Sequence, residues 1–377
     1  INDYNEIAKN IEDYVNDEKW GKIIEDSKIF RGVIESVSPS PCSFLLYDKP
    51  ISEEVGLIKV GDEICCCIDG YQCDQWKFLK NDYLTVSVYK LISETYKTIG
   101  KPIDTIEQLL DKVDDKVWRL YKDGITATLN QTDSDFARNL VMQYAPKSLG
   151  ELSALVAAIR PGFASLLNNF IQRKSYSTGV KELDELLKDS YHYMLYQESI
   201  MKFLTWLDIP EKDTYDIIKK IAKKKFKESE LIELEKKLHR NWYDKVGKEE
   251  GFKEAWQVIN DAVKYAFNAS HSLSVAIDSL YGAYLKANYP LEYMTVALNE
   301  YLDDIDKTTK ITNELSYFNI KLSPPKFRYS RANYMFDKEN NTIYKGISSI
   351  KYLNKQVAEE LYELRDKQYP NFATLLH

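Results

Sequence analysis

Cysteine, histidine and long apolar runs are all scarce in this sequence of 377 residues. All five cysteines lie between Cys42 and Cys73, and no C-x-x-C pair or neighbouring histidine completes a zinc pattern. The adjacent thiols at 65–67 fit a reducing cytoplasm better than a disulfide framework. The longest apolar stretch, LSALVAAI, has eight residues, too few to span a bilayer. No signal peptide is recognised, so we expect a cytoplasmic protein without a membrane partner.

The charge balance excludes a uniformly basic coat for nucleic acid, because the net charge is −7. A local basic groove remains compatible with this balance. The chain is 44% hydrophobic and 29% charged, which indicates a folded protein with a substantial core. Its length favours two or three structural units. It begins with Ile rather than Met, so a fragment of a longer protein is one interpretation.

The residue pattern predicts an α+β protein that is mostly α. Between about 32 and 90, four short segments rich in β-formers (SFLLYD, GLIKV, EICCCID and YLTVSVY) predict strands. Helical periodicity dominates from 105 to about 318. Two prolines make 323–336 a connection, followed by a weak strand in NTIYKG and a helix through NKQVAEELYELRDKQ. The expected architecture is a small α+β piece followed by a large helical domain.

The segment KFLKNDYL places Lys80 and Asp82 two residues apart in an expected strand. Alternation then points both side chains to one face. The ordinary interpretation is a surface salt bridge. The functional interpretation is a metal-binding carboxylate beside a lysine that neutralises a polyphosphate. A single carboxylate is a poor magnesium site, because Mg²⁺ normally uses one or two carboxylates together with phosphate oxygens.

Residues 266–290, AFNASHSLSVAIDSLYGAYLKANYP, place small polar residues and His271 before an apolar stripe with helical spacing. Ser270 or Ser272 is expected to cap the first turn, and Pro290 lies just past the end of the helix. An ordinary capped helix is one interpretation. The other is a helix start that receives a nucleotide phosphate.

Two further segments carry positive charge. Arg160 stands at a helix end in IRPGF, where a guanidinium suits bidentate phosphate recognition, although a plain helix stop explains the pattern equally. The segment KKIAKKKFK contains six lysines: Lys219, Lys220, Lys223, Lys224, Lys225 and Lys227. Such a patch suits contacts to backbone phosphates, although a charge run is more often a solvated helix face.

Taken in order along the chain, these segments resemble the bacterial DNA polymerase III alpha subunits, the C-family replicative polymerases. ELSALVAAIRPG resembles the family's helix ending in R-P-G, and YMLYQESIM resembles Y-Q-E-x-x-M. FNASHSLSVA resembles F-N-K-S-H-x-x-x-Y-x, and YLKANYPLEYM resembles the following L-K-x-x-Y-P-x-E-(F/Y)-M run. YQCD then LKND resembles T-Q-(F/Y)-D then (L/V)-K-x-D, and NQTDS resembles F-Q-x-E-S. IKLSPP and YKGISSIKYLNKQVAEEL resemble the double-proline linker and the start of the helix-hairpin-helix region.

The resemblance runs from about residue 20 to the end and implies a layout. Residues 1–34 would finish the thumb. Residues 35–90 would form the second half of a nucleotidyltransferase-like palm, a small mixed α/β portion. Residues 91–320 would be helical fingers, and 321–377 would be a linker and the start of a degenerate helix-hairpin-helix and clamp-binding region.

The resemblance also implies chemistry and partners. Asp82 matches the third catalytic carboxylate, a ligand of two Mg²⁺ ions, and Lys80 matches the lysine beside the incoming triphosphate. The implied activity is template-directed DNA synthesis. The implied partners are primer-template DNA, dNTPs, the N-terminal half of the polymerase and a sliding clamp. The implied location is cytoplasmic, at the nucleoid or in a phage replication complex.

The finger elements that line the nucleotide pocket are matched by Arg160, Asn268, Ser270 and His271. The family's R-R-x-x-G-K-K-K segment is matched by the lysine patch. That match makes five lysines candidates for DNA binding: Lys219, Lys220, Lys223, Lys224 and Lys225.

The sequence departs from the family in ways that bear on activity. The P-D-(I/F)-D-x-D-F motif with the first two catalytic aspartates does not occur. We therefore expect aspartates outside this chain, from the same gene or a separate chain, to share the two ions. Pro41 replaces a family histidine, and Ala269 and Val275 replace the Lys and Tyr that flank the motif histidine.

Further on, Tyr352 and Asn354 replace glycines of the helix-hairpin-helix region, which weakens its phosphate-binding nest. The leading hypothesis is a divergent polymerase of host or phage origin. The alternatives are a catalytically inactive homologue that acts as a DNA- or clamp-binding scaffold, and a helical interaction protein.

Overall fold

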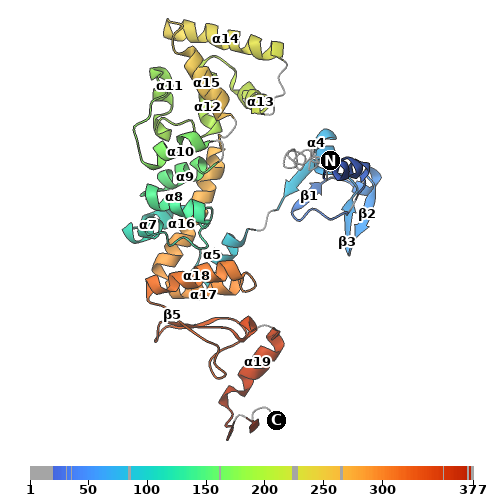
Figure 1. Cartoon of the computed structure of the whole chain (residues 1–377), viewed down its shortest axis with the longest axis vertical. Coiled ribbons are helices and arrows are strands. Elements are labelled where there is room, and N and C mark those ends of the chain that lie inside the picture. Colours follow the sequence, from blue (N-terminus) through green and yellow to red (C-terminus); the bar gives the residue numbers. More distant parts are fainter. Residues whose placement is uncertain are drawn as a thin grey trace. The chain divides into compact units, whose positions relative to one another are not determined.

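A computed structural model of the chain describes residues 20–374 except 31, 35, 84–85, 161–162, 223–227, 264–265, 351 and 372. The side chains of residues 189 and 228 are also outside the described part. The chain divides into two compact units, Ile1–Val86 and Ser87–His377, which we describe separately. The described part is mostly helical with small sheets (Figure 1), which confirms the expected fold class.

The described part of the N-terminal unit contains two antiparallel two-stranded ribbons and two α-helices. Strand β1 pairs with β4, and β2 pairs with β3. The elements are α3 (Trp20–Ser27), β1 (Ser43–Leu46), β2 (Leu57–Val60), β3 (Glu63–Cys66), α4 (Gly70–Gln75) and β4 (Leu79–Asp82). The predicted strands in SFLLYD, GLIKV and EICCCID are therefore confirmed. The strand predicted in YLTVSVY is wrong from residue 87 onward, because helix α5 begins at Ser87.

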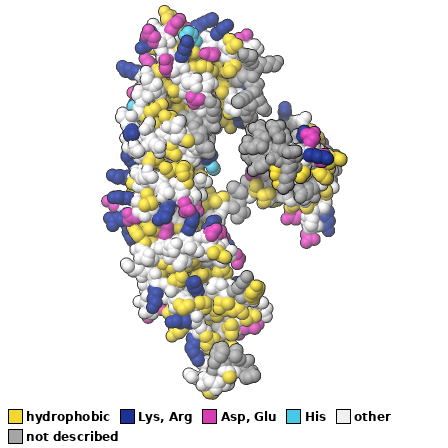
Figure 2. Space-filling view, viewed as in Figure 1, with side chains coloured by type: hydrophobic (Ala, Val, Ile, Leu, Met, Phe, Trp, Pro, Cys, Tyr) yellow, Lys and Arg dark blue, Asp and Glu magenta, His cyan; other side chains and the backbone are white. Residues whose placement is uncertain are grey.

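The described residues of the N-terminal unit bury few hydrophobic side chains. Among its described residues, only Val55 and Cys73 are buried hydrophobic side chains. Ile64, Leu79 and many other large apolar side chains are exposed, and Figure 2 shows hydrophobic atoms on the surface of this unit. Isolated two-stranded ribbons are marginal in water, and the described residues of this unit add little apolar burial to stabilise them.

The larger unit is built around α16 (Ala269–Asn288), a helix whose Ala276, Leu280, Ala283 and Leu285 are fully buried. It packs against α5, α7 and α9, and Figure 1 shows it running along the stack of helices. The preceding helices are α5 (Ser87–Ile99), α6 (Ile106–Lys112), α7 (Asp115–Lys122), α8 (Asp135–Tyr144), α9 (Leu149–Ala158), α10 (Ala164–Ile171), α11 (Lys181–Leu186) and α12 (Gln197–Trp206).

A second apolar cluster joins α12 to the helices that follow it. Trp242 and Phe203 lie at its centre, with ring centroids 6.4 Å apart. The helices are α13 (Glu211–Ala222), α14 (Glu228–Val246) and α15 (Phe252–Ala262). No helix in the described part is both long and apolar enough to cross a bilayer.

The C-terminal elements follow α16 without a break in packing. Strand β7 lies between β5, to which it is parallel, and β6, to which it is antiparallel. The elements are α17 (Pro290–Glu300), α18 (Ile305–Glu314), β5 (Lys321–Ser323), β6 (Met335–Asp337), β7 (Thr342–Tyr344) and α19 (Lys355–Glu363). The strand in NTIYKG and the helix after it are confirmed. The expected connection at 323–336 instead begins and ends inside strands.

Single turns of 3₁₀-helix complete the described part: Lys28–Phe30, Ile51–Glu53, Lys188–Ser190, Leu315–Phe318, Ile347–Ser349 and Leu364–Asp366.

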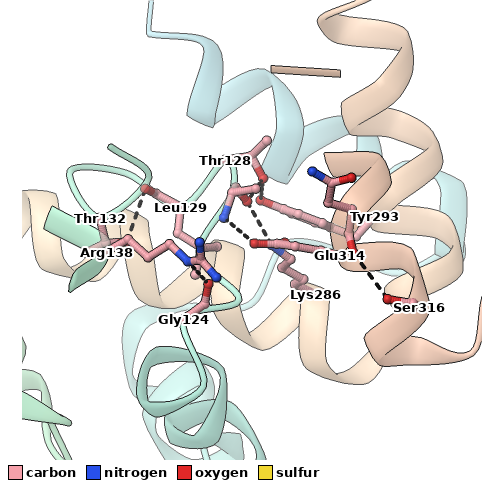
Figure 3. A network of polar contacts seen from close by, with 11 residues as sticks. Gly124, Thr128, Leu129, Thr132, Arg138, Lys286, Tyr293, Glu314 and Ser316 are labelled. Atoms are coloured by element: carbon pink, nitrogen blue, oxygen red, sulfur yellow. Dashed lines mark hydrogen bonds and ion pairs between the residues drawn. The ribbon is translucent and has the colours of Figure 1, made fainter. Parts of the chain in front are cut away.

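The loop between α7 and α8 is tied to the helices around it (Figure 3). Arg138 Nε donates to the Gly124 carbonyl at 2.7 Å. The hydroxyls of Thr128 and Tyr293 are hydrogen-bonded at 3.0 Å. Tyr293 is fully buried in α17, so this loop is part of the core rather than a surface connection.

The start of α16 corrects one prediction. Asn268, not Ser270 or Ser272, caps the helix, because its side-chain oxygen accepts the His271 N–H at 2.9 Å. Asn is as good a cap as Ser, and it stands one residue before the first helical position. Both serines lie inside the first turn. Pro290 follows the helix as expected and is the first residue of α17.

Candidate catalytic and nucleotide-binding sites

Asp82 and Lys80 lie on one face of the β1–β4 ribbon, as strand alternation predicts. Lys80 Nζ donates to Asp82 Oδ1 at 2.8 Å and to Oδ2 at 2.7 Å. Ser43, directly opposite Asp82 in the ribbon, donates its hydroxyl to Oδ1 at 2.5 Å. The Asp82 side chain is 51% exposed. The carboxylate is thus fixed in direction yet open to solvent.

Hydrogen bonding keeps this pair charged. The bonds from Lys80 and then from Ser43 lower the pKa of the Asp82 carboxyl. The same bond to Asp82 raises the pKa of the Lys80 ammonium. Asp82 is therefore an anion at neutral pH, which is the form that a cation requires.

The donor chemistry of Asp82 fits Mg²⁺, a hard cation that binds carboxylate oxygen. No group of three or more His, Cys, Asp or Glu residues in the described ranges is placed to hold a metal ion. Within the described ranges Asp82 is therefore a single carboxylate, and a metal ion bound to it would need further ligands. Both Asp82 oxygens are bonded to Lys80, so a metal ion would displace the lysine from at least one of them.

In the larger unit, Arg160, Phe267 and His271 form one cluster. The Arg160 guanidinium carbon lies 3.6 Å from the centre of the Phe267 ring. His271 meets the same ring edge-on, with centroids 5.0 Å apart and planes at 78°. A cation over an aromatic face is favourable. Two of the residues predicted for the nucleotide site are thus brought together by a third, Phe267, which the sequence interpretation did not single out.

The segment that resembles Y-Q-E-x-x-M holds this cluster in place. Gln197 N–H donates to the Phe267 carbonyl and Phe267 N–H donates to the Leu195 carbonyl, both at 2.9 Å. Glu198 Oε2 accepts the Ala269 N–H at 2.9 Å. Residues 195–198 therefore fix the turn that starts α16. The sequence interpretation did not single out Glu198 either, although this residue is the Glu of the segment that resembles Y-Q-E-x-x-M.

Tyr196 ties α9 to α16 beneath this turn. Its phenol lies near the Ser153 and Ser272 hydroxyls, and burial raises the pKa of the phenol. The Ser153 and Ser272 hydroxyls are themselves 3.0 Å apart. A buried polar contact of this kind favours one register between α9 and α16.

The start of α16 has fewer free backbone N–H groups for an anion than the sequence implies. The Asn268 side chain occupies the His271 N–H, and the Glu198 carboxylate occupies the Ala269 N–H. Asn268, Ser270 and His271 are nonetheless exposed beside the half-buried Arg160. A phosphate here would meet the guanidinium and these polar side chains rather than a fully open helix end.

The lysine patch is only partly described. Lys219 and Lys220 are exposed in the last turn of α13, and Lys219 lies over the Tyr215 ring at 4.4 Å. Positive charge at a helix C-terminus is favourable in itself. The predicted Lys223, Lys224 and Lys225 lie outside the described residues.

The structure shows the local environment of three residues that depart from the family pattern. Val275 is buried in α16 at 8% exposure, so the side chain at this position packs into the core. Asn354 caps α19 by accepting the Val357 N–H at 2.9 Å. Tyr352 has a left-handed φ of 73°, the region that favours the glycine of the family motif.

The comparisons with known proteins agree with these segments. Residues 86–243 match the family described as the bacterial DNA polymerase III alpha subunit finger domain. A DNA polymerase III alpha subunit of Aquifex aeolicus is 29% identical over 99% of this chain and 33% of its own length. The chain is homologous to the bacterial DNA polymerase III alpha subunits. This confirms the resemblance.

Other polymerase III alpha subunits show the same extent of match. That of Campylobacter jejuni is 28% identical over 76% of this chain and 25% of its own length. The alpha subunit of Mycobacterium tuberculosis is 25% identical over 91% of this chain and 30% of its own length. The chain thus spans a third or less of these polymerase III relatives.

Proposed function

We propose that this chain supplies one catalytic carboxylate, the fingers and DNA contacts of a C-family DNA polymerase that performs template-directed DNA synthesis. The observation that carries the proposal is the exposed, ionised Asp82 fixed beside Lys80, in a chain homologous to polymerase III alpha subunits. In this proposal, residues 35–90 belong to the palm and 91–320 to the fingers. Residues 1–34 finish the thumb, and 321–377 start the helix-hairpin-helix and clamp-binding region.

In this proposal Asp82 holds Mg²⁺ together with two aspartates from outside this chain. Bound there, two such ions would supply Lewis-acid chemistry for a primer 3′-hydroxyl and for a leaving pyrophosphate. Ser43 keeps the Asp82 carboxylate oriented. Lys80 provides positive charge for the triphosphate of the incoming dNTP, at an ammonium that remains charged because its pKa is raised.

The Arg160 cluster is the proposed binding site for the triphosphate in the fingers. Phe267 holds the guanidinium flat, so less side-chain freedom is lost when phosphate binds. Asn268, Ser270 and His271 are exposed at the same turn and are the proposed polar partners of the nucleotide. Lys219 and Lys220, with Lys223, Lys224 and Lys225, are the proposed contacts to DNA phosphates.

The apolar surface of the N-terminal unit supports a further part of the proposal. A unit whose described residues bury only Val55 and Cys73 as hydrophobic side chains leaves most of its apolar area in water, which is unfavourable. We propose that the N-terminal half of the polymerase covers this surface and completes the palm. A sliding clamp and a cytoplasmic location, at the nucleoid or in a phage replication complex, remain part of the same proposal.

The alternative is a catalytically inactive homologue that serves as a DNA- or clamp-binding scaffold. Two observations favour it: both Asp82 oxygens are satisfied by Lys80, as in an ordinary ion pair, and Val275 offers no aromatic ring at a position where the family has Tyr.

Primer extension distinguishes the two functions. The assembly is purified from its native host by a tag on this chain and supplied with Mg²⁺, dNTPs and a primer-template. Asp82→Asn should abolish extension and preserve primer-template binding, because only a metal ligand is lost. Asp62→Asn, at an exposed carboxylate in the turn between β2 and β3, is the matched control. Unchanged extension by Asp82→Asn would remove Asp82 from the mechanism. Binding without extension by the wild-type assembly would favour the scaffold.

A further inference from the structure

A pocket of about 270 Å³ opens in the larger unit, and none of the residues assigned above lines it. Its walls come from the end of α8, the end of α10, and the segments before and after α11. Figure 1 shows α8, α10 and α11 along one side of the helical stack. The pocket is lined by aromatic rings and basic side chains, and none of its described lining side chains is acidic.

The aromatic wall presents flat rings. Tyr176 stacks on Tyr193 with centroids 4.3 Å apart and an interplanar angle of 11°. Tyr144 stacks on Phe170 at 5.0 Å and 14°. The Tyr193 side chain is almost fully buried, yet its hydroxyl has no hydrogen-bond partner among the described residues. A buried hydroxyl without a partner is unfavourable, so the Tyr193 hydroxyl is an unsatisfied polar group within this wall.

One basic residue of the pocket is structural. The Arg173 guanidinium donates to both Glu151 oxygens, at 2.6 and 2.7 Å, and lies over the Tyr144 ring. This residue is fixed and its charge is matched. It shapes the wall rather than offering a free cation.

The other basic residues are at the rim. Lys174 is exposed and makes no ion pair with any described residue. Lys188 is also exposed and forms an ion pair with the exposed Glu185 at 2.7 Å. His192 lines the same pocket. The rim therefore carries positive charge that an anion can reach.

The backbone around the pocket is unusual. Arg173, Tyr191 and His192 have left-handed φ values of 52°, 57° and 66°. Such conformations are disfavoured for side chains other than Gly, and to a lesser degree Asn and Asp. They persist where the surroundings fix them, often at functional sites. Here they bring an arginine, a tyrosine and a histidine to one opening.

We propose that this pocket binds one nucleotide unit of single-stranded DNA, with the base against Tyr176 and the phosphate near Lys174 and Lys188. Flat aromatic rings beside a basic rim are the combination with which proteins hold single strands. The volume is at the low end of small-ligand pockets, so it takes a single unit while the strand continues over the rim. The choice of DNA as the polymer rests on the proposed polymerase function.

The test is fluorescence anisotropy with the purified 377-residue chain and a labelled oligothymidylate, at several salt concentrations. Tyr176→Ala should weaken binding about tenfold, whereas Tyr176→Phe keeps the stacked ring and should bind like wild type. An abasic strand of equal length should be insensitive to Tyr176→Ala. Lys174→Gln with Lys188→Gln should reduce the slope of log affinity against log salt by about 0.7 for each lysine. Lys181→Gln, at an exposed lysine that does not line the pocket, is the matched control.

Equal binding of oligothymidylate by wild type and by both the tyrosine and the lysine variants overturns the proposal, as does the absence of binding by wild type. The lysines are exposed, so their variants report even if Tyr176→Ala fails to fold. If thymidine 5′-monophosphate binds as tightly as the strand and loses affinity in the same variants, the occupant is a free nucleotide and the single-strand assignment is wrong. Primer extension by Asp82→Asn tests the catalytic proposal separately. If that proposal fails, extension is unchanged in Asp82→Asn, whereas the binding of oligothymidylate still tests the pocket.

Discussion

Lys286 and Glu314, which are labelled in Figure 3, both form hydrogen bonds with the backbone of Ala127. Lys286 Nζ donates to the Ala127 carbonyl at 2.8 Å, and the Ala127 N–H donates to Glu314 Oε1 at 2.9 Å. The ammonium and the carboxylate also pair directly. The Lys286 side chain is fully buried. One ion pair thus fixes α16, α18 and the loop between α7 and α8 in a single arrangement.

Lys286→Met should destabilise the chain by about 3 kcal/mol, because a buried carboxylate is left without its cation. Urea unfolding followed by the circular dichroism of the helices measures this change. Lys286→Met combined with Glu314→Gln should recover about half of the loss, since no charge is then buried alone. A single variant as stable as wild type would show that the pair contributes nothing.

Asn268→Ala should cost about 1 kcal/mol, because the cap that accepts the His271 N–H is removed. Asn268→Ser keeps a capping oxygen and should lose only a small part of that stability. The same urea experiment compares the two. If the proposed nucleotide role of Asn268 is also right, the KM for dNTP in primer extension should rise for both variants, which separates binding from capping.

Lys80→Met should raise the pKa of the Asp82 carboxyl toward its usual range, because the bond from Lys80 is the largest cause of the lowered pKa. Ser43→Ala should change the pKa in the same direction by less. Carbon NMR titration of the Asp82 carboxyl measures both. A lowered pKa contributes stability above the pKa of the unfolded chain, and this is lost as the pH falls through the folded pKa. An unchanged titration would contradict the pairing.

Lys219→Glu with Lys220→Glu should weaken binding to primer-template DNA and flatten its salt dependence. If each lysine contacts a phosphate, the slope of log affinity against log salt falls by about 0.9 for each. Lys116→Glu with Lys122→Glu, at two exposed lysines of α7, is the control with the same change in charge. Equal effects from the two pairs would indicate a general influence of net charge rather than a specific contact.

Local periodicity predicted the elements that are long or strictly alternating. The Lys80–Asp82 pair follows from a period of two, and α16 follows from its apolar spacing. YLTVSVY was wrongly predicted as a strand because the segment is rich in β-branched residues and contains only the first turn of α5. The helix becomes evident only when Leu91, Ile92 and Tyr96, all buried, are included with Val88. The three-residue strands β5 and β6 are too short to leave a pattern.

The candidate site was predicted only in part, for a similar reason. Arg160 and His271 were singled out, but the Phe267 ring that joins them was not. The bond between Glu198 and the Ala269 N–H spans 71 positions, so no local signal predicts it. Lys286 belongs to a recognised motif, yet its burial is contrary to the usual exposure of lysine.

The shortage of core in the N-terminal unit also bears on how long its backbone hydrogen bonds persist. The described part of this unit buries only Val55 and Cys73 as hydrophobic side chains, so its two ribbons have little packing that must be disrupted before they open. The centre of α16 opens only when several helices separate. Amide hydrogens of β1 and β4 should therefore exchange with deuterium far sooner than those around Leu280. If the proposed N-terminal half of the polymerase binds this unit, exchange in those strands should become slower.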